Sequence, residues 1–375
     1  MKIGFIHHSM IIGSGIDTVI WEIASRLCEE HDVEILTFNS EYSSPIIREI
    51  RFPFKKNRVI NGVFNPVIPH TYSLRRHLDK FDAINVHHYP ANIIPFFPSR
   101  SDTFIAVTEW SGPPSSKLGA VKFHEKLYMK LIRKMNKIAA LKADGLIAPC
   151  PFVKRWIKEN YGLDSEQIYL DGINFQLFNR EYDYRPINFM DGYINILYVG
   201  RVAPHKNIEC LIESFQILKE YIDDVRLIIV GRRTFPVYYK NLMKILRKKG
   251  LEDDVIFTGK VSWEELPRYY SACDIYATCS LWEGFLRAEA FAMGKPMVAF
   301  DVGANSDTIH NGKNGILVKE KSSKAFAEGL IRLASDENLR KKMGERGYKW
   351  AKENLDFNVI AKNFSNYLEE AISCR

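Results

Sequence analysis

Short apolar runs recur along the chain, and most of them are followed by a polar turn and a stretch with helical spacing. Lys2–His7 is such a run, and Asp17–Cys28 then places Val19, Ile23 and Leu27 on one helical face. Alternating strands and amphipathic helices are typical of α/β domains built on a parallel sheet. The pattern predicts further buried strands over Val33–Thr37, Phe81–His88, Thr103–Thr108, Ala143–Ala148, Gln167–Leu170, Ile194–Val199, Val225–Val230, Val255–Thr258, Ile275–Thr278 and Met297–Phe300.

The length of 375 residues suggests two domains. Glu181–Tyr193 is polar and contains Pro and Gly, so it reads as the linker between them. We therefore expect a first domain over 1–183 and a second over 184–356. The segment Ser40–Arg76 has no clear periodicity and receives no firm assignment. Helices are predicted over Pro151–Tyr161, Tyr238–Lys249, Phe285–Met293, Ser323–Ser335, Glu337–Glu353 and Phe357–Ser373.

Composition places the chain among soluble globular proteins, with 46% apolar and 26% charged residues. No run of about 18 apolar residues occurs and the chain starts directly with a strand, so we expect neither a transmembrane helix nor a signal peptide. The six cysteines have no CxxC spacing and lie mostly in apolar segments. They indicate reduced, buried thiols in a cytoplasmic protein.

Positive charge is concentrated in the stretch 117–142, which holds eight Lys or Arg residues and one acid, Glu125. This stretch alone carries +7, the net charge of the whole chain. Its apolar residues have roughly helical spacing, so it predicts a basic amphipathic helix that could lie on an anionic membrane surface. A core-packed helix with a solvated basic face remains the alternative. No nucleic-acid module accompanies it, so we expect no nucleic-acid partner.

Glycines follow the first predicted strand, where Gly13 and Gly15 flank Ser14. The spacing is not GxGxxG and no P-loop lysine follows, so a nicotinamide-dependent dehydrogenase is not favoured. Two explanations stay open for this turn. Its backbone amides could approach a phosphate group or an acceptor, or the glycines could serve only a tight strand–helix turn.

The stretch from Asp274 to Ala304 has a strand, a polar turn, a short helix and a second strand. The turn carries Glu283, and Glu289 lies on the helix. In open α/β sheets ligands bind at the carboxyl ends of the strands, close to helix N-termini. This stretch therefore predicts a ligand site.

The same stretch resembles the signature of retaining glycosyltransferases of family 4, which have the GT-B fold of two Rossmann-like domains facing across a cleft. Glu283-Gly284-Phe285, Glu289-Ala290 and Gly294-Lys295-Pro296 match it in order. The family usually has seven residues between the two glutamates, whereas this chain has five. Arg287 lies in the shortened turn and could add a cation toward a diphosphate. The resemblance also implies that the last helix, about 357–375, crosses back to the first domain.

A second match follows the strand Ile194–Val199, where Gly200-Arg201 and, after four intervening residues, Lys206-Asn207 resemble the family's Gly-Arg and Lys-Asn. A nucleotide-diphosphate leaving group gains negative charge as the glycosidic bond breaks. Arginine offers a rigid donor fork and lysine a compact point charge, so both can stabilise that charge in place of a metal ion.

On the acceptor side the resemblance is weaker. His87 and His88 end the strand before Tyr89, where the family commonly has a histidine near the acceptor, although a histidine can equally cap a buried strand. The family also often has a donor-contacting histidine where this chain has Trp110. Glu109 is the alternative polar partner there.

The resemblance implies a retaining, metal-independent glycosyltransferase that needs no cofactor. Its donor would be a UDP-, GDP- or ADP-linked sugar, and its acceptor a sugar, a lipid-linked molecule or a polysaccharide. The protein itself could lie at the inner face of the membrane. Arg201 and Lys206 would neutralise the diphosphate, Glu283 would contact the donor sugar, and Glu289 would bind the ribose hydroxyls. The alternatives are a degenerate, non-enzymatic partner protein and a nucleotide-sugar 2-epimerase of the same fold. The donor site would also include Gly13, Gly15, Gly200, Gly284, Phe285 and Arg287.

Overall fold

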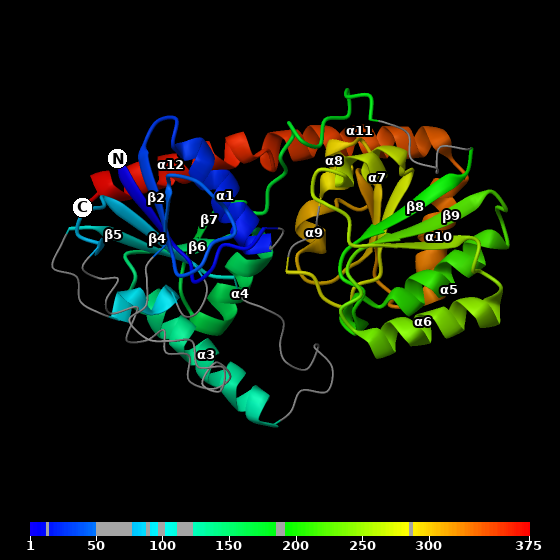
Figure 1. Ribbon diagram of the computed structural model, residues 1–375, viewed down its shortest axis with the longest axis horizontal. Coiled ribbons are helices and arrows are strands. Elements are labelled where there is room, and N and C mark those ends of the chain that lie inside the picture. Colours follow the sequence, from blue (N-terminus) through cyan, green and yellow to red (C-terminus); the bar gives the residue numbers. More distant parts are fainter. Residues whose placement is uncertain are drawn as a thin grey trace. The chain divides into compact units, whose positions relative to one another are not determined.

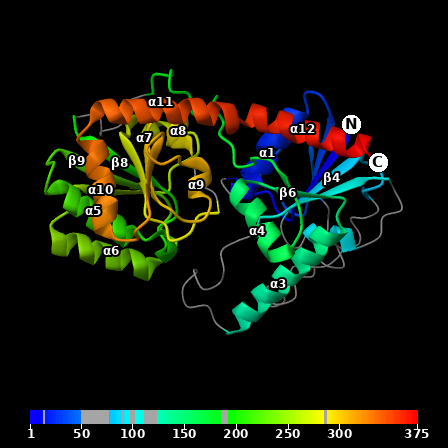
Figure 2. The same cartoon turned by 180° about the vertical axis from the view of Figure 1, so that it is seen from behind.

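The chain forms two compact units, each built on a parallel sheet. The computed structural model describes residues 1–12, 15–49, 77–87, 91–96, 102–110, 123–184, 192–284 and 288–375. The first unit holds the described residues up to Gly172 together with Phe357–Arg375, and the second holds Ile173–Asp356. Both units are drawn in Figures 1 and 2. The predicted α/β class, with two parallel-sheet domains, is confirmed.

The sheet of the first unit has seven parallel strands in the order β3-β2-β1-β4-β5-β6-β7. The order reverses direction between β1 and β4, which makes this pair the topological switch point of the sheet. The central strands are buried on both faces, as their continuous apolar runs predict. The strands are β1 (Lys2–Ile6), β2 (Asp32–Thr37), β3 (Ile47–Glu49), β4 (Ala83–His87), β5 (Phe104–Thr108), β6 (Gly145–Ala148) and β7 (Glu166–Gln167).

Helices α1 (Gly15–Leu27) and α12 (Phe357–Ser373) pack against one another on one side of this sheet (Figure 1). The apolar face of α12 is buried, with Ile360, Phe364 and Leu368 almost fully covered. The last helix of the chain thus completes the core of the first unit. The other helical segments of this unit are η3 (Ala91–Phe96), α3 (Phe123–Lys142) and α4 (Pro151–Tyr161).

The sheet of the second unit has six parallel strands in the order β10-β9-β8-β11-β12-β13. Here the order reverses between β8 and β11, so this pair is the switch point of the second sheet. The strands are β8 (Ile194–Val199), β9 (Val225–Val230), β10 (Val255–Gly259), β11 (Ile275–Thr278), β12 (Met297–Phe300) and β13 (Gly315–Val318).

Both faces of the second sheet are covered by helices (Figures 1 and 2). Ile196 and Tyr198 of β8 share one core with helices α5, α6 and α10, while Tyr276 of β11 stacks on Tyr270 of α7. Alternate residues of each strand point to opposite faces, which explains this division. The helical segments are η5 (Pro204–Lys206), α5 (Ile208–Lys219), α6 (Pro236–Lys249), α7 (Leu266–Ala272), α8 (Glu289–Ala292), α9 (Asn305–Thr308), α10 (Ser323–Ala334) and α11 (Glu337–Asn354).

The chain passes from the first unit to the second at Ile173, earlier than the polar segment suggests. Ile173 donates a backbone hydrogen bond to Leu355 O, and Phe178 packs edge-on against Trp263 and Tyr270. These apolar contacts hold 173–183 to the second unit, although the sequence analysis assigns this segment to the first domain.

The six cysteines are free thiols, but two of them are not buried. Cys28 and Cys374 are exposed, and Cys150, Cys210, Cys273 and Cys279 are buried. Cys28 follows the last residue of α1 and Cys374 follows α12, so both lie beyond the packed part of a helix. The expectation of buried thiols therefore fails at the two helix ends.

Candidate functional site

The candidate donor site lies at the carboxyl edge of the second sheet, at its switch point. The loop after β8 carries Arg201 and Lys206, and the loop after β11 carries Glu283. Because β8 and β11 are hydrogen-bonded neighbours, the two loops leave the sheet side by side. The strand order thus brings together the residues of the two strongest sequence motifs.

A short turn directs Lys206 toward the β11 loop. The turn η5 ends at Lys206, and Asn207 then adopts a left-handed conformation with φ 52° before α5 begins. Asparagine tolerates this conformation better than most residues. Lys206 therefore sits at a sharp corner rather than on the following helix.

Lys206 Nζ lies 2.6 Å from Glu283 Oε1, and only 17% and 12% of the two side chains are exposed. A partly desolvated ion pair of this geometry holds both groups in place. Arg201 is exposed, and no ion pair links its guanidinium to any acid that the structure describes. One of the two motif cations is thus neutralised internally, and the other is open to solvent.

Backbone hydrogen bonds tie the loops of this edge to one another. Leu281 N donates to His205 O at 3.0 Å, which links the β11 loop to the β8 loop. Ala304 N donates to Glu283 O at 3.0 Å, which links the β11 loop to the β12 loop. Next to Ala304, Gly303 has φ +56°, and a Cβ atom there would lie 1.9 Å from Glu283 O. Only glycine permits this close approach behind Glu283.

The same kind of contact continues across β9 and β10. A Cβ atom on Gly231 would lie 1.8 Å from Gly200 O, and Gly231 N donates to Gly259 O at 2.8 Å. Gly200 and Gly231 follow β8 and β9, and Gly259 is the last residue of β10, so glycines allow the backbones to touch where these three strands end. Gly200 serves this packing, in addition to its predicted place in the donor site.

His205 was not singled out by the sequence analysis, yet it lies between the two cations in the chain. Burial lowers the pKa of His205 to about 4, and the charges of Lys206 and Arg201 act in the same direction. Its imidazole is therefore neutral near pH 7, and the positive charge of this loop belongs to Arg201 and Lys206. A histidine beside two motif cations is the signal that could have identified it.

Glu289 begins α8 and is 6% exposed. The structure describes α8 only over Glu289–Ala292, which is shorter than the helix expected over Phe285–Met293. A helix of one turn contributes little dipole, so the predicted helix-terminus effect is small here. Gly284 lies in the turn after Glu283, with open space at its Cβ position. Phe285 and Arg287 lie outside the described residues.

The first unit has a polar cluster at its own switch point, where β1 and β4 end. His7 follows β1 and its Nε2 lies 2.9 Å from Asp17 Oδ1 of α1, with both side chains buried. Asp17 Oδ2 also accepts from Ile11 N at 2.7 Å. Asp17 thus fixes the start of the loop that leads to Gly13. The sequence analysis missed both residues, although a histidine directly after the first strand is a usable signal.

Among the acceptor-side candidates, His87 and Trp110 are brought together. Trp110 Nε1 donates to His87 Nδ1 at 3.1 Å, and both side chains are buried. Glu109 is buried as well, and its Oε2 accepts from Tyr161 OH at 3.0 Å. The side chains of His87, Glu109 and Trp110 are thus turned into the protein interior, where two of these contacts are the hydrogen bonds just described. Gly15 is the first residue of α1, and His88 and Gly13 lie outside the described residues.

Two further observations concern the described part of the chain only. It contains no group of three or more His, Cys, Asp or Glu side chains arranged to hold a metal ion. None of its helices combines the length and the apolar composition needed to cross a bilayer.

Two family models match the chain, one in each half. "Glycosyltransferase Family 4" matches residues 13–170, and "Glycosyl transferases group 1" matches residues 180–350. The second match contains Arg201, Lys206, Glu283 and Glu289. Together the two matches contain every strand of the two sheets except β1.

Several curated relatives are named as glycosyltransferases or as transferases of a particular sugar. An uncharacterized glycosyltransferase of Methanocaldococcus jannaschii, MJ1069, is 28% identical over 260 residues, which are 67% of this chain and 65% of the relative. A GDP-mannose-dependent alpha-(1-6)-phosphatidylinositol monomannoside mannosyltransferase of Mycobacterium tuberculosis is 25% identical over 182 residues, or 46% of each chain. The chain thus spans less than two thirds of the length of these relatives.

Solved structures agree on the fold over the full length. Sucrose-phosphate synthase from Thermosynechococcus elongatus has a TM-score of 0.80 at 18% identity, with 100% of both chains covered. Anabaena HepE in complex with UDP has a TM-score of 0.78 at 18% identity, covering 99% of this chain and 100% of that one. With both sheets, the donor-site motifs and the two family models in agreement, the chain belongs to the family 4, group 1 glycosyltransferases of GT-B fold.

Proposed function

We propose that this protein transfers a sugar from a nucleotide-diphosphate sugar to an acceptor hydroxyl. The observation that carries the proposal is the Lys206–Glu283 pair at the β8/β11 switch point, with Arg201 exposed on the same loop. An anionic diphosphate suits two cations, and a carboxylate suits sugar hydroxyls. The transfer is retaining, as the family resemblance implies.

The ion pair suggests how the donor enters. Without a ligand, Glu283 neutralises Lys206 at 2.6 Å. A diphosphate carries more charge than one carboxylate and competes for Lys206, so Glu283 becomes available to accept hydrogen bonds from the donor sugar. The same loops hold both partners by backbone bonds, so little rearrangement is needed.

The cations also define the chemical step. Negative charge builds up on the leaving diphosphate, and Arg201 and Lys206 stabilise it more strongly as the bond breaks. We propose that they do so without a metal ion. The departing phosphate oxygen then takes the proton of the acceptor hydroxyl, on the face where the new bond forms. Glu289 would bind the ribose hydroxyls, and the residues near His87 belong to the acceptor side.

The relatives suggest classes of donor and acceptor. One relative is named as GDP-mannose-dependent and acts on a phosphatidylinositol mannoside. Another, CapM of Staphylococcus aureus, is named for capsular polysaccharide biosynthesis and is 25% identical over 260 residues. HepE was solved with UDP-glucose. We propose a UDP-, GDP- or ADP-linked hexose as donor and a lipid-linked or polysaccharide acceptor.

A donor panel tests the proposal. The purified chain is heated with UDP-, GDP- and ADP-sugars in the presence of a metal chelator. A donor at a hundred times its dissociation constant stabilises the folded protein by about 2.7 kcal/mol, so one nucleotide class should raise the melting temperature by several degrees. Arg201→Ala should lose that shift, whereas Lys244→Ala, an exposed lysine of α6, should keep it.

Other outcomes point elsewhere. No stabilisation by any nucleotide sugar would contradict the donor site and favour a non-enzymatic partner protein. Donor consumption without an acceptor, yielding free nucleotide, would favour a 2-epimerase or a hydrolase.

We also propose that α3 contacts an anionic membrane surface. In the part of α3 whose side chains are described, Leu131 and Leu141 are 54% and 56% exposed, beside exposed Arg133 and Lys134. Leucines that are exposed among basic residues are expected for a helix that lies on a bilayer surface. They are not expected for a helix whose apolar face is packed in a core.

Vesicle binding tests this contact. Each basic residue near an anionic surface contributes about 1 kcal/mol, so the double variant Arg133→Ala, Lys134→Ala should bind phosphatidylglycerol vesicles about thirtyfold more weakly. The matched control is Lys240→Ala, Lys244→Ala on α6, which removes the same charge. Equal losses in the two double variants would assign the binding to net charge and not to α3.

A further inference from the structure

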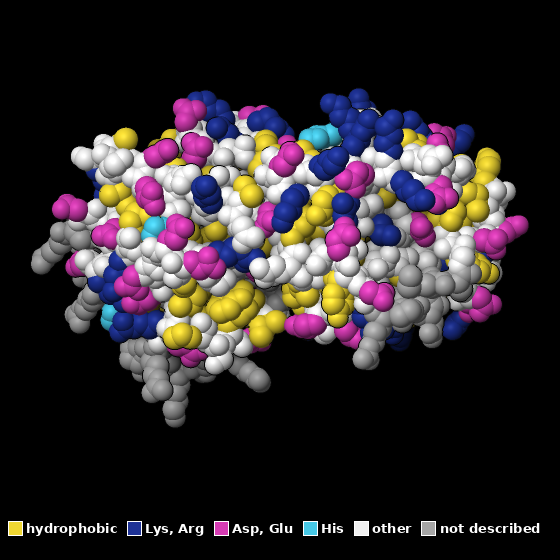
Figure 3. All heavy atoms as spheres, turned by 90° about the horizontal axis from the view of Figure 1, so that it is seen from above, with side chains coloured by type: hydrophobic (Ala, Val, Ile, Leu, Met, Phe, Trp, Pro, Cys, Tyr) yellow, Lys and Arg dark blue, Asp and Glu magenta, His cyan; other side chains and the backbone are white. Residues whose placement is uncertain are grey.

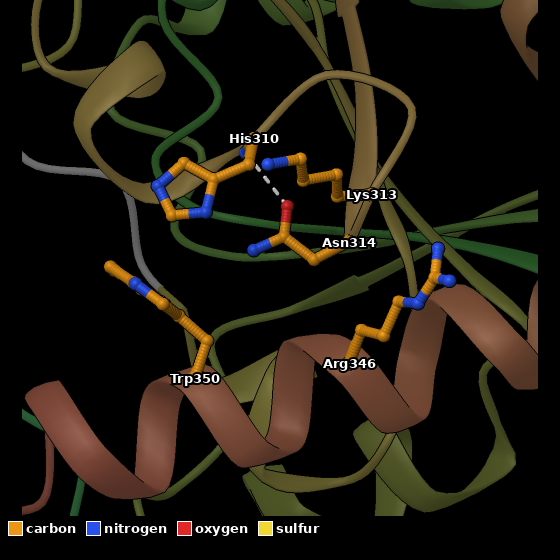
Figure 4. Close-up of a pocket in the computed structure, with 5 residues that line it drawn as sticks. All are labelled: His310, Lys313, Asn314, Arg346 and Trp350. Atoms are coloured by element: carbon orange, nitrogen blue, oxygen red, sulfur yellow. Dashed lines mark hydrogen bonds between the residues drawn. The ribbon is translucent and has the colours of Figure 1, made fainter.

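The second unit has a hollow at the opposite edge of its sheet from the donor site. It has a volume of about 340 Å³ and is lined by His310, Lys313, Asn314, Arg346 and Trp350, which define what we call the α11 pocket (Figure 4). The loop 309–314 leads into the amino end of β13, whereas Lys206 and Glu283 follow the carboxyl ends of β8 and β11. Because all strands are parallel, the α11 pocket lies at the amino ends of the strands and the donor site lies at their carboxyl ends.

The loop side of the α11 pocket is preformed. Asn314 is 2% exposed, and its Oδ1 accepts from His310 N at 2.7 Å while its Nδ2 donates to Thr308 O at 3.1 Å. Asn311 Oδ1 accepts from Leu317 N at 3.0 Å. The loop is thus held at both ends, and Lys313 is carried on a fixed turn.

The helix side is held just as closely. A Cβ atom on Gly344 would lie 1.8 Å from Gly294 O, and one on Gly347 would lie 2.4 Å from the Phe291 ring, so α11 packs very close to the elements beneath it. Arg346 and Trp350 are four residues apart and share a helix face. The Trp350 indole meets the His310 ring edge-on, with centroids 5.2 Å apart.

The α11 pocket carries positive charge that no acid among the described residues neutralises. No ion pair within the described residues involves Lys313 or Arg346, and the neighbouring acid Glu345 is already bound by Arg180 at 2.6 Å. Burial and Lys313 lower the pKa of His310, so its ring adds no charge near pH 7. In Figure 3, Lys and Arg side chains gather over α11.

The lining points to one class of ligand. Two cations that no described acid pairs with favour an oxyanion, and an indole offers an apolar surface for the face of a ring. We propose that the α11 pocket binds an acidic saccharide, a pyranose that carries a carboxylate or phosphate group. A free phosphate ion would use the cations but leave Trp350 and most of the 340 Å³ unfilled.

A membrane fits the α11 pocket less well. Insertion into a bilayer needs protruding apolar side chains, and among the described residues no large exposed hydrophobic side chain belongs to α11 or to the loop 309–314. The α11 pocket is concave, so it can receive a ligand group of its own size, whereas insertion into a bilayer needs side chains that protrude. We infer a second saccharide site that would hold a growing or acceptor glycan away from the transfer site.

The test measures binding of a labelled galacturonic acid oligosaccharide to the full chain, with no nucleotide present. A galactose oligosaccharide of equal length should not bind. Arg346→Ala and Lys313→Ala should each weaken binding about tenfold or more, because each removes a charge-assisted contact. Lys349→Ala removes an exposed cation of the same helix outside the lining and should have no effect.

Four results would overturn the proposal. One is equal binding of the neutral and acidic oligosaccharides, and another is unchanged affinity in both pocket variants. The third is inorganic phosphate binding alone, which would assign the cations to a free phosphate. The fourth concerns vesicles of equal parts phosphatidylglycerol and phosphatidylcholine. If the wild type binds these vesicles but not the acidic oligosaccharide, and Arg346→Ala loses the vesicle binding, the pocket is assigned to a membrane. Because no donor is used, failure of the donor-site proposal leaves this experiment intact.

Discussion

Lys206→Ala should lower kcat/KM for sugar transfer by about 10²- to 10³-fold, the range typical of removing one group that stabilises charge in a transition state. The structure gives the reason, because Lys206 is a largely buried cation held at a sharp turn beside Glu283. Steady-state kinetics with the donor identified in the thermal panel would measure the loss. Lys244→Ala on α6 is the control, and unchanged kinetics in Lys206→Ala would remove Lys206 from the mechanism.

The partner residue sharpens this prediction. Glu283→Gln keeps the shape of the side chain but removes the charge that neutralises Lys206. We therefore expect this variant to bind the nucleotide diphosphate product more tightly than the wild type while transferring sugar more slowly. Calorimetric titration with the diphosphate separates the two effects. Weaker diphosphate binding in Glu283→Gln would show that Glu283 does not compete with the ligand for Lys206.

Gly303→Ala should be the most damaging glycine substitution at the donor site. A methyl group at this position would lie 1.9 Å from Glu283 O, and the φ of +56° disfavours any side chain. The backbone behind Glu283 must then move, and a displacement near 1 Å can cost about a hundredfold in rate. We expect a loss of activity of that size, together with a lower free energy of unfolding.

Gly250→Ala provides a matched comparison. Gly250 has a similar φ of +65°, but nothing lies within 4 Å of its Cβ position at the end of α6. Only the conformational cost of about 1–2 kcal/mol remains there, so activity measured below the melting temperature should be unchanged. If both variants lose activity equally, the effect of Gly303 is one of general stability and not of Glu283 placement.

Much of the fold could be predicted because each strand is a compact apolar run bounded by turns. Ile194–Val199, Val225–Val230 and Ile275–Thr278 were predicted with the bounds that the structure shows. Gly315–Val318 was not predicted as a strand, because it begins with a glycine directly after a turn rich in Asn and Gly, so its first residue reads as part of that turn. Similarly, Gln167–Leu170 was predicted as a strand but only Glu166–Gln167 pair with β6.

The candidate site was predictable in position but not in contacts. Polar residues at the carboxyl ends of parallel strands share one edge, which placed Arg201, Lys206 and Glu283 together. That Lys206 and Glu283 form an ion pair depends on the path of two loops, and periodicity carries no information on loop paths. The His7–Asp17 pair was missed for a related reason, since it depends on how α1 turns its first residues toward β1.

The packing of α12 on α1 has a consequence for synthesis of the protein. Residues 1–172 leave the ribosome long before Phe357–Ser373 is made, yet Phe364 and Leu368 of that helix are fully buried in the first unit. During translation the apolar surface that they cover stays exposed while the whole second unit is being added. The second unit, continuous from Ile173 to Asp356, can complete its own core first. Vectorial folding would thus run against the order of the chain, with the N-terminal unit finished last.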